Sequence, residues 1–373
     1  GVDKDPDMRL FLQDSKRPAP HFDAREGRWL GVPSWPSKSI KEDTYFFNGN
    51  RLSSIQNETT INTQLTVSSP QTTGIYGGEW CAYGLGKVAP ELPLDQREDD
   101  SGSLIFDGDP LLKAISIVGE GRVRLNISSD VPQALIAVRL NNIHPNGAVE
   151  RISYGVLNLS HRESDENPDP LTPNKFYEVT VRLKGVAQVV PKGHQLRISV
   201  STSYWPLIWP SPTPTVITID PSRSTVSLPI LHNEDNFHNT KFLPPEHATP
   251  LNMTVKKVGN ESRTFTHKFD DLSTKFVVKR DDGSSIIDDI GTEISFTKEK
   301  VLSIKQDDPL SAAMEFNCTA HYTRDDWDAR VETTTHTSCD KTHFYLSGII
   351  TAFSKGELFA SRKFNKKIER DCM

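Results

Sequence analysis

The stretch from Gly193 to Ile219, GHQLRISVSTSYWPLIWPSPTPTVITI, most narrows the folds that this chain can adopt. Residues 196–200 alternate apolar with polar side chains, a period of two that predicts a strand with one buried face. Four prolines then follow within nine residues, from Pro206 to Pro214. Proline lacks a backbone N–H and fixes φ, so this segment is an extended loop and not a helix. A strand, a stiff loop and a second strand indicate a β protein.

The rest of the chain repeats this pattern of short alternating segments between turn residues. Almost no segment shows a helical period, and 22 glycines and 25 prolines divide the 373 residues into short pieces. The pattern predicts an all-β fold built from sandwiches. In the first two thirds we expect strands at Met8–Leu12, Thr44–Phe47, Arg51–Ser53, Thr63–Val67, Ala114–Val118, Arg122–Ser128, Leu135–Ile143, Val149–Leu159, Phe176–Leu183, Gln195–Thr202, Thr215–Ile219 and Thr225–Ile230.

Composition shifts along the chain predict four parts. Residues 1–40 form an irregular, proline-rich connector, and residues 41–235 form a jelly-roll β-sandwich of antiparallel strands. Residues 236–250 contain three prolines and form a linker. Residues 251–373 form a second antiparallel β domain. The long Gly- and Pro-rich loop over 74–100 is expected to serve a function or to dock on a partner.

The second domain is predicted to be a twisted meander. Its expected strands are Met253–Lys257, Arg263–Lys268, Lys275–Lys279, Glu293–Phe296, Val301–Ile304, Ala313–His321, Ala329–Thr337, His343–Thr351 and Leu358–Phe364, with turns at Gly259-Asn260 and near Asp325-Asp326. Within Ala313–His321 the inward set is Met314, Phe316, Cys318 and Ala320.

The cysteines at 81, 318, 339 and 372 include no C-x-x-C pair. In the predicted meander Cys318 faces about position 333, which leaves Cys339 roughly 20 Å away along the strand. A disulfide requires Cα atoms within about 7 Å, so we expect four reduced thiols and a cytoplasmic protein.

Net charge and hydropathy exclude two classes of partner. A formal charge of −6 gives no electrostatic basis for binding nucleic acid or an anionic membrane. The chain has no run of about 18 apolar residues, the length that a membrane-spanning helix needs. We therefore expect neither a nucleic-acid nor a membrane partner.

Chemistry-bearing motifs are sparse. No G-x-S-x-G nucleophile elbow occurs, and no alternating β/α pattern could hold one. His232, Glu234, Asp235 and His238 have the composition of a metal site, but a solvated linker entry explains them better. The acidic pairs 99–100, 281–282, 288–289 and 307–308 are interpreted as turn or cap residues and not as calcium ligands. His194 is interpreted as a turn histidine bonded to backbone. We expect no metal, no cofactor and no catalytic residue.

Tyr204, Trp205 and Trp209 are the candidate binding residues. Large aromatic rings on a loop stiffened by proline can stack on a flat ligand such as a sugar, or can form the contact between two domains. The domain contact is favoured. The ligand alternative describes a free-standing jelly-roll module that binds a carbohydrate.

Four segments carry a resemblance to a known family. They are Gly1–Gln13 (GVDKDPDMRLFLQ), Gln96–Asp107 (QREDDSGSLIFD), Ile152–Arg162 (ISYGVLNLSHR) and the Tyr204–Pro212 loop. In them the chain resembles the C-terminal region of CocE/NonD acyl hydrolases, relatives of X-Pro dipeptidyl-peptidases. Asp326–Phe344 is similar to the tail of a longer subgroup of that family.

The resemblance implies both a fold and a partner. It implies a galactose-binding-like jelly roll over 41–230 that packs on an α/β-hydrolase catalytic domain and helps to wall its substrate pocket. The family's catalytic Ser, Asp and His all precede the matched region, so no triad residue can be placed on this sequence. A truncated piece, a split-gene product and a natural accessory protein all stay open. An independent enzyme with an unrecognised site is the least favoured hypothesis.

Overall fold

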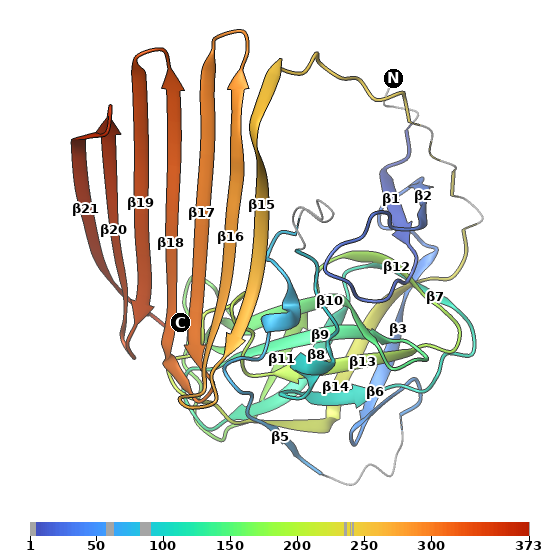
Figure 1. Cartoon of the computed structure of the whole chain (residues 1–373). Helices are drawn as coiled ribbons and strands as arrows, with labels where there is room; N and C mark the ends of the chain where they lie inside the picture. Colours follow the sequence, from blue (N-terminus) through green and yellow to red (C-terminus); the bar gives the residue numbers. More distant parts are fainter. Residues whose placement is uncertain are drawn as a thin grey trace. The chain divides into compact units, whose positions relative to one another are not determined.

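The structure is a computed structural model that describes residues 5–56, 63–82, 91–234, 237–238, 240 and 242–372. Nearly every regular element is a strand, which confirms the all-β class. The chain divides into two compact units between Leu243 and Pro244, and the first unit also takes the last residues from Cys372. Figure 1 colours the first unit from blue to yellow and the second from yellow to red.

The strands of the first unit form one hydrogen-bonded network of 14 strands. Its main path runs β10-β9-β13-β6-β4-β3-β14-β7-β12-β1-β2, with β5 and β8 pairing β14, and β11 pairing β8. The strands are β1 (Met8–Gln13), β2 (Gly27–Val32), β3 (Ile40–Asn48), β4 (Arg51–Ser53), β5 (Leu65–Val67), β6 (Leu104–Asp107), β7 (Ile115–Gly119), β8 (Arg122–Ser129), β9 (Leu135–Ile143), β10 (Val149–Asn158), β11 (Tyr177–Arg182), β12 (Val186–Val190), β13 (Gln195–Ser201) and β14 (Ile217–Leu231).

Alternate residues of these strands meet in one apolar core. β8 and β14 contribute from one side, and β9 and β13 contribute from the other. This arrangement is a β-sandwich, in which the period-two pattern of each strand buries one face. The central core residues are Val123, Leu125, Ile127, Ile136, Val138, Leu140, Leu196, Ile198, Val200, Ile217, Ile219, Val226 and Leu228, none more than 2% exposed. The jelly-roll connectivity and the galactose-binding-like likeness stay predictions.

Several local predictions for the first unit are confirmed and others are wrong. The Asn48-Gly49 turn joins β3 to β4, with Asn48 paired to Arg51. The sequence patterns did not predict β2, β6 or β12. The two strands expected at 215–219 and 225–230 are one continuous strand, β14, whose pairing to β8 shifts register between Asp220 and Thr225.

The second unit is a single sheet of seven antiparallel strands in sequence order. The strands are β15 (Met253–His267), β16 (Ser273–Ile287), β17 (Thr292–Lys305), β18 (Asp308–Arg324), β19 (Trp327–Cys339), β20 (His343–Ser354) and β21 (Glu357–Glu369). The order of the meander and its hairpin at Asp325-Asp326 are confirmed, but the two strands expected at 293–296 and 301–304 are one continuous strand, β17. The turn expected at Gly259-Asn260 is wrong, because both residues lie inside β15 and pair or contact β16.

Cross-strand pairing gives this sheet a mixed face, on which apolar residues alternate along the ladder with Lys298, Lys300 and threonines. Met314 pairs with Leu302, and Ala320 pairs with both Phe296 and Val331, so the predicted inward set shares a face with other apolar residues. Met314, Phe316, Cys318 and Ala320 are only half-buried. Cys318 pairs with Thr333, as the hairpin geometry predicted, and Cys339 pairs with Phe344; the four cysteines are thiols and not half-cystines.

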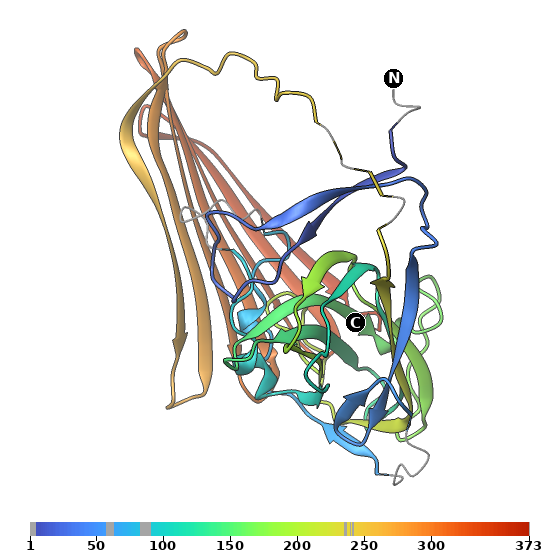
Figure 2. The same cartoon turned by 90° about the vertical axis from the view of Figure 1, so that its right-hand side faces the viewer.

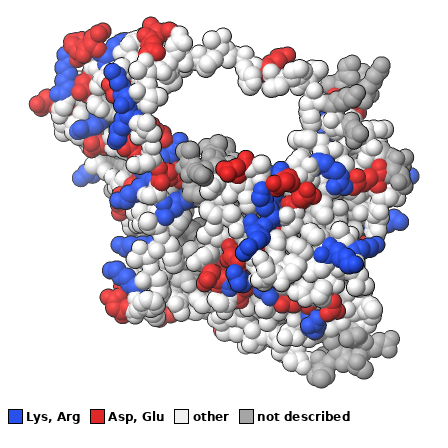
Figure 3. Space-filling model, turned by 45° about the vertical axis from the view of Figure 1, so that its right-hand side comes forward, with Lys and Arg blue, Asp and Glu red and all other residues white. Residues whose placement is uncertain are grey.

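Helical structure is confined to short turns. Within the described ranges the one α-helix is α1 (Arg97–Asp100), and the 3-10 turns include η2 (Ile75–Gly77) and η4 (Leu159–His161). None of the helices in the described part of the chain has the length and apolar character to cross a membrane. On the face drawn in Figure 3, basic and acidic side chains of the described residues lie interspersed, without a continuous patch of one sign.

Candidate functional site

A polar layer covers the outer side of β9 and β13 in the first unit. Arg139 and Asn141 of β9 lie opposite Ser199 and Arg197 of β13, so their four side chains share the face that points away from the core. The helix α1 and the residues before it close over this face. Arg139 has no exposed surface, and Asn141 and Ser199 are equally buried.

Asp100 in α1 is the centre of this layer. Its carboxylate accepts hydrogen bonds from Arg197 Nη1 at 2.8 Å and from Ser199 Oγ at 2.7 Å. Arg139 Nη2 lies 3.1 Å from Asp100 Oδ1, and Arg197 also grips Asp107 with bonds of 2.6 and 2.8 Å. Charged side chains in a dry site are stable only when they are paired in this way. The acidic pair 99–100 therefore anchors α1 to the sheet, a buried role that the interpretation as turn or cap residues did not include.

The surroundings shift the pKa values in this layer. Burial raises the pKa of Asp99 above its ordinary value, although the nearby Arg139 and the backbone N–H of Gly74 oppose that rise. For Arg197, burial lowers the pKa, but its hydrogen bonds to Asp107 and Asp100 outweigh that effect and the pKa rises. Arg197 thus stays charged, and the ion pairs of this layer hold α1 against β9 and β13.

The aromatic loop after β13 packs inside the same unit. Tyr204 and Trp205 have no exposed surface. The Tyr204 ring lies 5.6 Å from the Tyr154 ring, and its hydroxyl accepts a hydrogen bond from Arg151. Neither ring faces solvent, so neither can stack on a ligand or a second domain unless the loop opens. Trp209, the third candidate binding residue, is half-buried.

A second polar cluster surrounds Glu150 at the start of β10. Glu150 is 5% exposed, and its carboxylate accepts hydrogen bonds from Ser15 Oγ at 3.0 Å and Asn142 Nδ2 at 3.0 Å. The Arg25 guanidinium lies 2.7 Å from Glu150 Oε1, and His144 Nε2 lies 3.5 Å from Oε2. One carboxylate thereby holds the segment before β2 against β9 and β10.

Two histidines meet beside this carboxylate. The rings of His144 and His194 lie 4.7 Å apart, and His194 Nδ1 lies 2.9 Å from Asn142 Oδ1. His194 lies in a turn, as expected, with its backbone N–H donating to the Pro191 carbonyl at 3.2 Å, but its ring binds the Asn142 side chain and not backbone. Burial and the neighbouring His144 lower the pKa of His194, although Glu150 opposes them. Burial would raise the pKa of Glu150, but its hydrogen bonds from His144, Asn142 and Ser15 and the charge of Arg25 lower it overall.

Ser15, Glu150 and His144 contain the three groups of a hydrolytic triad in an unsuitable order. In a working triad the imidazole lies between the hydroxyl and the carboxylate, so that it can take the hydroxyl proton. Here the carboxylate lies between the other two, and the Ser15 hydroxyl donates to it directly. Among the hydrogen bonds between described residues, none joins a serine hydroxyl to an imidazole. The cluster is built to hold a segment and not to activate a nucleophile.

Each described candidate metal residue of the linker entry contacts a different residue of the first unit. His232 Nε2 lies 3.1 Å from Asp43, Glu234 pairs with Arg28, and His238 bonds through its backbone to Gly31 at 2.9 Å. Asp235 lies outside the described residues. No cluster of His, Cys, Asp and Glu fit for a metal ion occurs in the part of the chain that the structure describes. The acidic pair 281–282 was predicted in a turn but lies inside β16 (Ser273–Ile287), where Asp281 accepts the backbone N–H of Gly283, whereas the pair 288–289 lies in the turn after that strand, as predicted.

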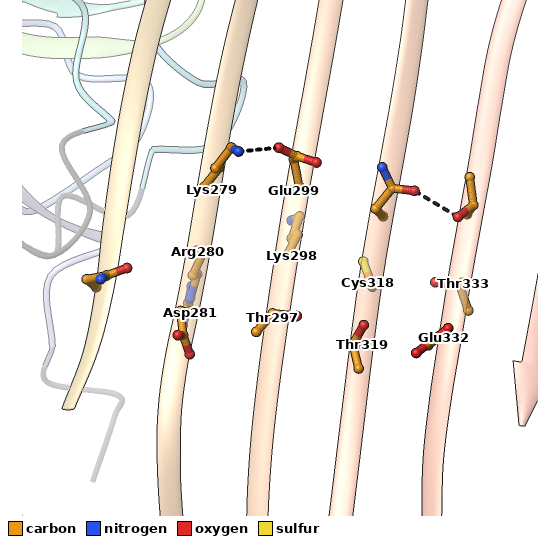
Figure 4. Close-up of a pocket in the computed structure, with 13 residues that line it drawn as sticks. Lys279, Arg280, Asp281, Thr297, Lys298, Glu299, Cys318, Thr319, Glu332 and Thr333 are labelled. Carbon is orange, nitrogen blue, oxygen red and sulfur yellow. Dashed lines mark hydrogen bonds and ion pairs between the residues drawn. The ribbon is translucent and has the colours of Figure 1, made fainter. Parts of the chain in front are cut away.

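A groove of about 530 Å³ crosses the second sheet (Figure 4). Lys279 and Glu299 pair across it at 2.8 Å, and Thr334 donates to Asn317 at 2.8 Å. Cys318 and Thr333 lie side by side in the same stretch of sheet. These pairs already satisfy one another, and the groove is open and polar, so it has the character of a solvated sheet face.

Sequence reasoning missed Arg139, Glu150 and His144. The available signal was a charged residue inside an otherwise apolar strand, since LIAVRLNNI places Arg139 among the buried residues of β9. Lys, Glu, Arg and Asp are almost never fully buried without a partner, so this placement itself indicates a partnered charge.

Comparison with known proteins identifies the family. Residues 1–251 match the family described as the X-Pro dipeptidyl-peptidase C-terminal non-catalytic domain. Cocaine esterase from Rhodococcus sp. (strain MB1 Bresler) is 22% identical over 186 residues, which cover 48% of this chain and 32% of the esterase. The Xaa-Pro dipeptidyl-peptidase of Ligilactobacillus salivarius is 24% identical over 47% of this chain and 26% of the enzyme. Thus the chain spans about a third or less of the length of these curated relatives.

Solved structures show the same likeness at lower similarity. An α-amino acid ester hydrolase aligns with a TM-score of 0.48 and 19% identity, over 54% of this chain and 39% of the hydrolase. A CocE/NonD family hydrolase from Staphylococcus aureus aligns with a TM-score of 0.44 and 12% identity, over 61% of this chain and 42% of the hydrolase. The family match covers 251 of the 373 residues. The chain belongs to the family of X-Pro dipeptidyl-peptidase C-terminal non-catalytic domains.

Proposed function

We propose that this chain is the accessory portion of a serine α/β-hydrolase of the CocE/NonD or X-Pro dipeptidyl-peptidase type. A separate catalytic domain performs acyl ester or peptide hydrolysis, and this chain stabilises that domain and helps to shape its substrate pocket. The match of residues 1–251 to the X-Pro dipeptidyl-peptidase C-terminal non-catalytic domain carries the proposal. The contacts of Ser15 and His144 agree with it, because the Glu150 carboxylate and not the imidazole accepts the serine hydroxyl.

The polar layer supports an accessory role. A domain that forms one wall of a neighbouring domain's pocket must hold its loops in fixed positions. Buried ion pairs fix α1 to β9 and β13, and the loss of either partner would leave an uncompensated buried charge. Of the three rings that we assign to a domain contact, Trp209 is the one with exposed surface. The four free thiols suit the cytoplasm, which we propose as the location.

A labelling experiment tests the proposal. A tagged chain is expressed in its native host, and the extract is treated with a fluorophosphonate probe, which reacts with activated serines, before capture on the tag. We expect a co-captured hydrolase to carry the probe and the captured fraction to cleave p-nitrophenyl esters or X-Pro p-nitroanilides. Probe on the chain itself, or a captured fraction without a labelled hydrolase, would refute the proposal.

A further inference from the structure

The hairpin β1–β2 buries one face and exposes the other. β1 and β2 pair antiparallel, with Leu10 opposite Leu30 and Phe11 opposite Trp29. Leu12 and Leu30 belong to a small core cluster, so their side of the hairpin packs on the unit. Residues that are odd-numbered in β1 point the other way. The hairpin ends the strand path at β2 and is drawn in blue in Figures 1 and 2.

Aromatic side chains gather on this outward face. The Phe11 and Trp29 rings lie 5.4 Å apart, and the Phe242 ring meets Trp29 edge-on at 4.8 Å. The Arg9 guanidinium lies over the Phe242 ring at 5.6 Å. Trp29 is 45% exposed and Phe242 is 53% exposed. Arg9, Phe11, Trp29 and Phe242 are called the aromatic ridge below.

The linker entry fixes Phe242 in this place. His238 exchanges two backbone hydrogen bonds of 2.9 Å with Gly31 of β2, and Glu234 pairs with Arg28. The chain therefore crosses β2 before it reaches Phe242. The ridge is assembled from the two ends of the first unit, and its rings contact one another within the chain itself.

The ridge has the chemistry of a binding hot spot. Tryptophan and arginine are enriched in such spots, and rings held rigidly lose little entropy on binding. Ile55 and Leu112 are also exposed in this unit, but neither side chain carries an aromatic ring. Trp80 is exposed as well, and the Lys184 ammonium lies over its ring. On the other side of the hairpin, Met8, Leu10 and Trp35 line a groove of about 600 Å³.

We propose that the aromatic ridge is the surface on which the serine-hydrolase catalytic domain docks. The inference rests on the proposed function. The family is described as the C-terminal non-catalytic domain, so in its members the catalytic domain precedes the matched region. The first strand of that region, β1, is then the part nearest to the catalytic domain along the chain. A rigid aromatic surface at this strand fits a folded protein face better than a small ligand.

Binding of an identified hydrolase tests the ridge. The hydrolase captured with the chain is accepted only if it carries the fluorophosphonate probe and mass spectrometry assigns it to the CocE/NonD family. It is then purified, and its Kd for the full chain is measured by calorimetry. We expect Trp29→Asp to weaken binding at least tenfold and Phe242→Ala to weaken it several-fold. Leu112→Asp is the control, since Leu112 is 90% exposed and lies outside both the ridge and the 74–100 loop, and we expect its Kd to stay within twofold of the wild type.

Two results would overturn the inference. One is an unchanged Kd in Trp29→Asp and Phe242→Ala while the wild type binds the hydrolase, which would leave the proposed function standing. The other is a chain that dimerises in sedimentation experiments and becomes monomeric in Trp29→Asp, which would assign the ridge to a second copy. Thermal unfolding of each variant checks that the fold is intact. Failure to recover any labelled hydrolase contradicts the proposed function instead.

Discussion

Two buried carboxylates fix covering segments to the strands of the first unit. Asp100 ties α1 to β9 and β13, and Glu150 ties the segment around Ser15 and Arg25 to β9 and β10. A buried ion pair adds little net stability compared with apolar packing, but removal of one partner leaves an uncompensated charge. These residues therefore determine mainly the position of the covering segments, and contribute less to the stability of the core.

Asp100→Asn is expected to destabilise the first unit by about 3 kcal/mol, because Arg139 and Arg197 lose a buried charge partner. Urea unfolding monitored by tryptophan fluorescence measures this loss. Glu178→Gln is the matched control, since Glu178 pairs with Arg124 at 3.6 Å on the surface and such pairs contribute about 1 kcal/mol or less. Equal losses in the two variants would contradict the role of Asp100.

Glu150 should make the chain sensitive to acid. Its folded pKa is lowered from 4.5, so its stabilising contribution is present above pH 4.5 and is lost as the pH falls through the folded pKa. The urea concentration at the unfolding midpoint should be lower in Glu150→Gln than in the wild type at pH 6. Between pH 6 and pH 3 it should fall less steeply in Glu150→Gln than in the wild type. Parallel curves for the two proteins would show that Glu150 does not contribute to the acid transition.

The long strands of the second unit contain Gly, Asn and Asp residues, which are the residue types that commonly form turns. In β16 the pairing to β17 shifts register between Asp281 and Ser284, and Gly283 has φ of +73°. Asp281 accepts the Gly283 backbone N–H, and the Lys257 ammonium reaches the same carboxylate at 2.5 Å. This is a β-bulge, which bends the strand without ending it.

Gly283→Ala is expected to destabilise the second unit by more than 2 kcal/mol, since left-handed φ alone costs roughly 1–2 kcal/mol and a Cβ adds a backbone clash. An ideal Cβ at Gly283 would lie 2.0 Å from the Lys257 carbonyl oxygen. Gly356→Ala is the control, because Gly356 has φ of +81° with open space around it. Urea unfolding followed by Trp327, the tryptophan that lies in the second unit, should show the larger loss in Gly283→Ala, and equal losses would contradict the clash.

The same bulges explain where sequence reasoning failed. Gly259-Asn260 and Asp281–Gly283 have the composition of hairpin turns, and turns and bulges both select Gly, Asn and Asp. Only the neighbouring strand distinguishes them, and single-sequence patterns carry no pairing information. The Asn48-Gly49 and Asp325-Asp326 turns were predictable because alternating apolar segments flank them at matching lengths.

At the scale of the whole molecule, two β units follow one another along the chain, and the family match ends at residue 251, just before β15. The all-β class, the meander order and the free thiols were predictable from periodicity and spacing. Three features could not be predicted, because each depends on segments that are distant in sequence. They are the burial of Tyr204 and Trp205, the ion pairs of Arg139 and the aromatic ridge. The aromatic contact surface predicted at 204–209 stays a prediction, and the Phe11, Trp29 and Phe242 rings form a second aromatic group on the hairpin and the linker entry.

The central claim is that this chain supports hydrolysis that another domain performs. The most direct test is an assay of the purified full chain with p-nitrophenyl esters, X-Pro p-nitroanilides and a fluorophosphonate probe, beside Ser15→Ala and His144→Ala. The account predicts no turnover above buffer and no probe on any of the three proteins. Turnover or labelling of the wild type that disappears in Ser15→Ala or His144→Ala would contradict it.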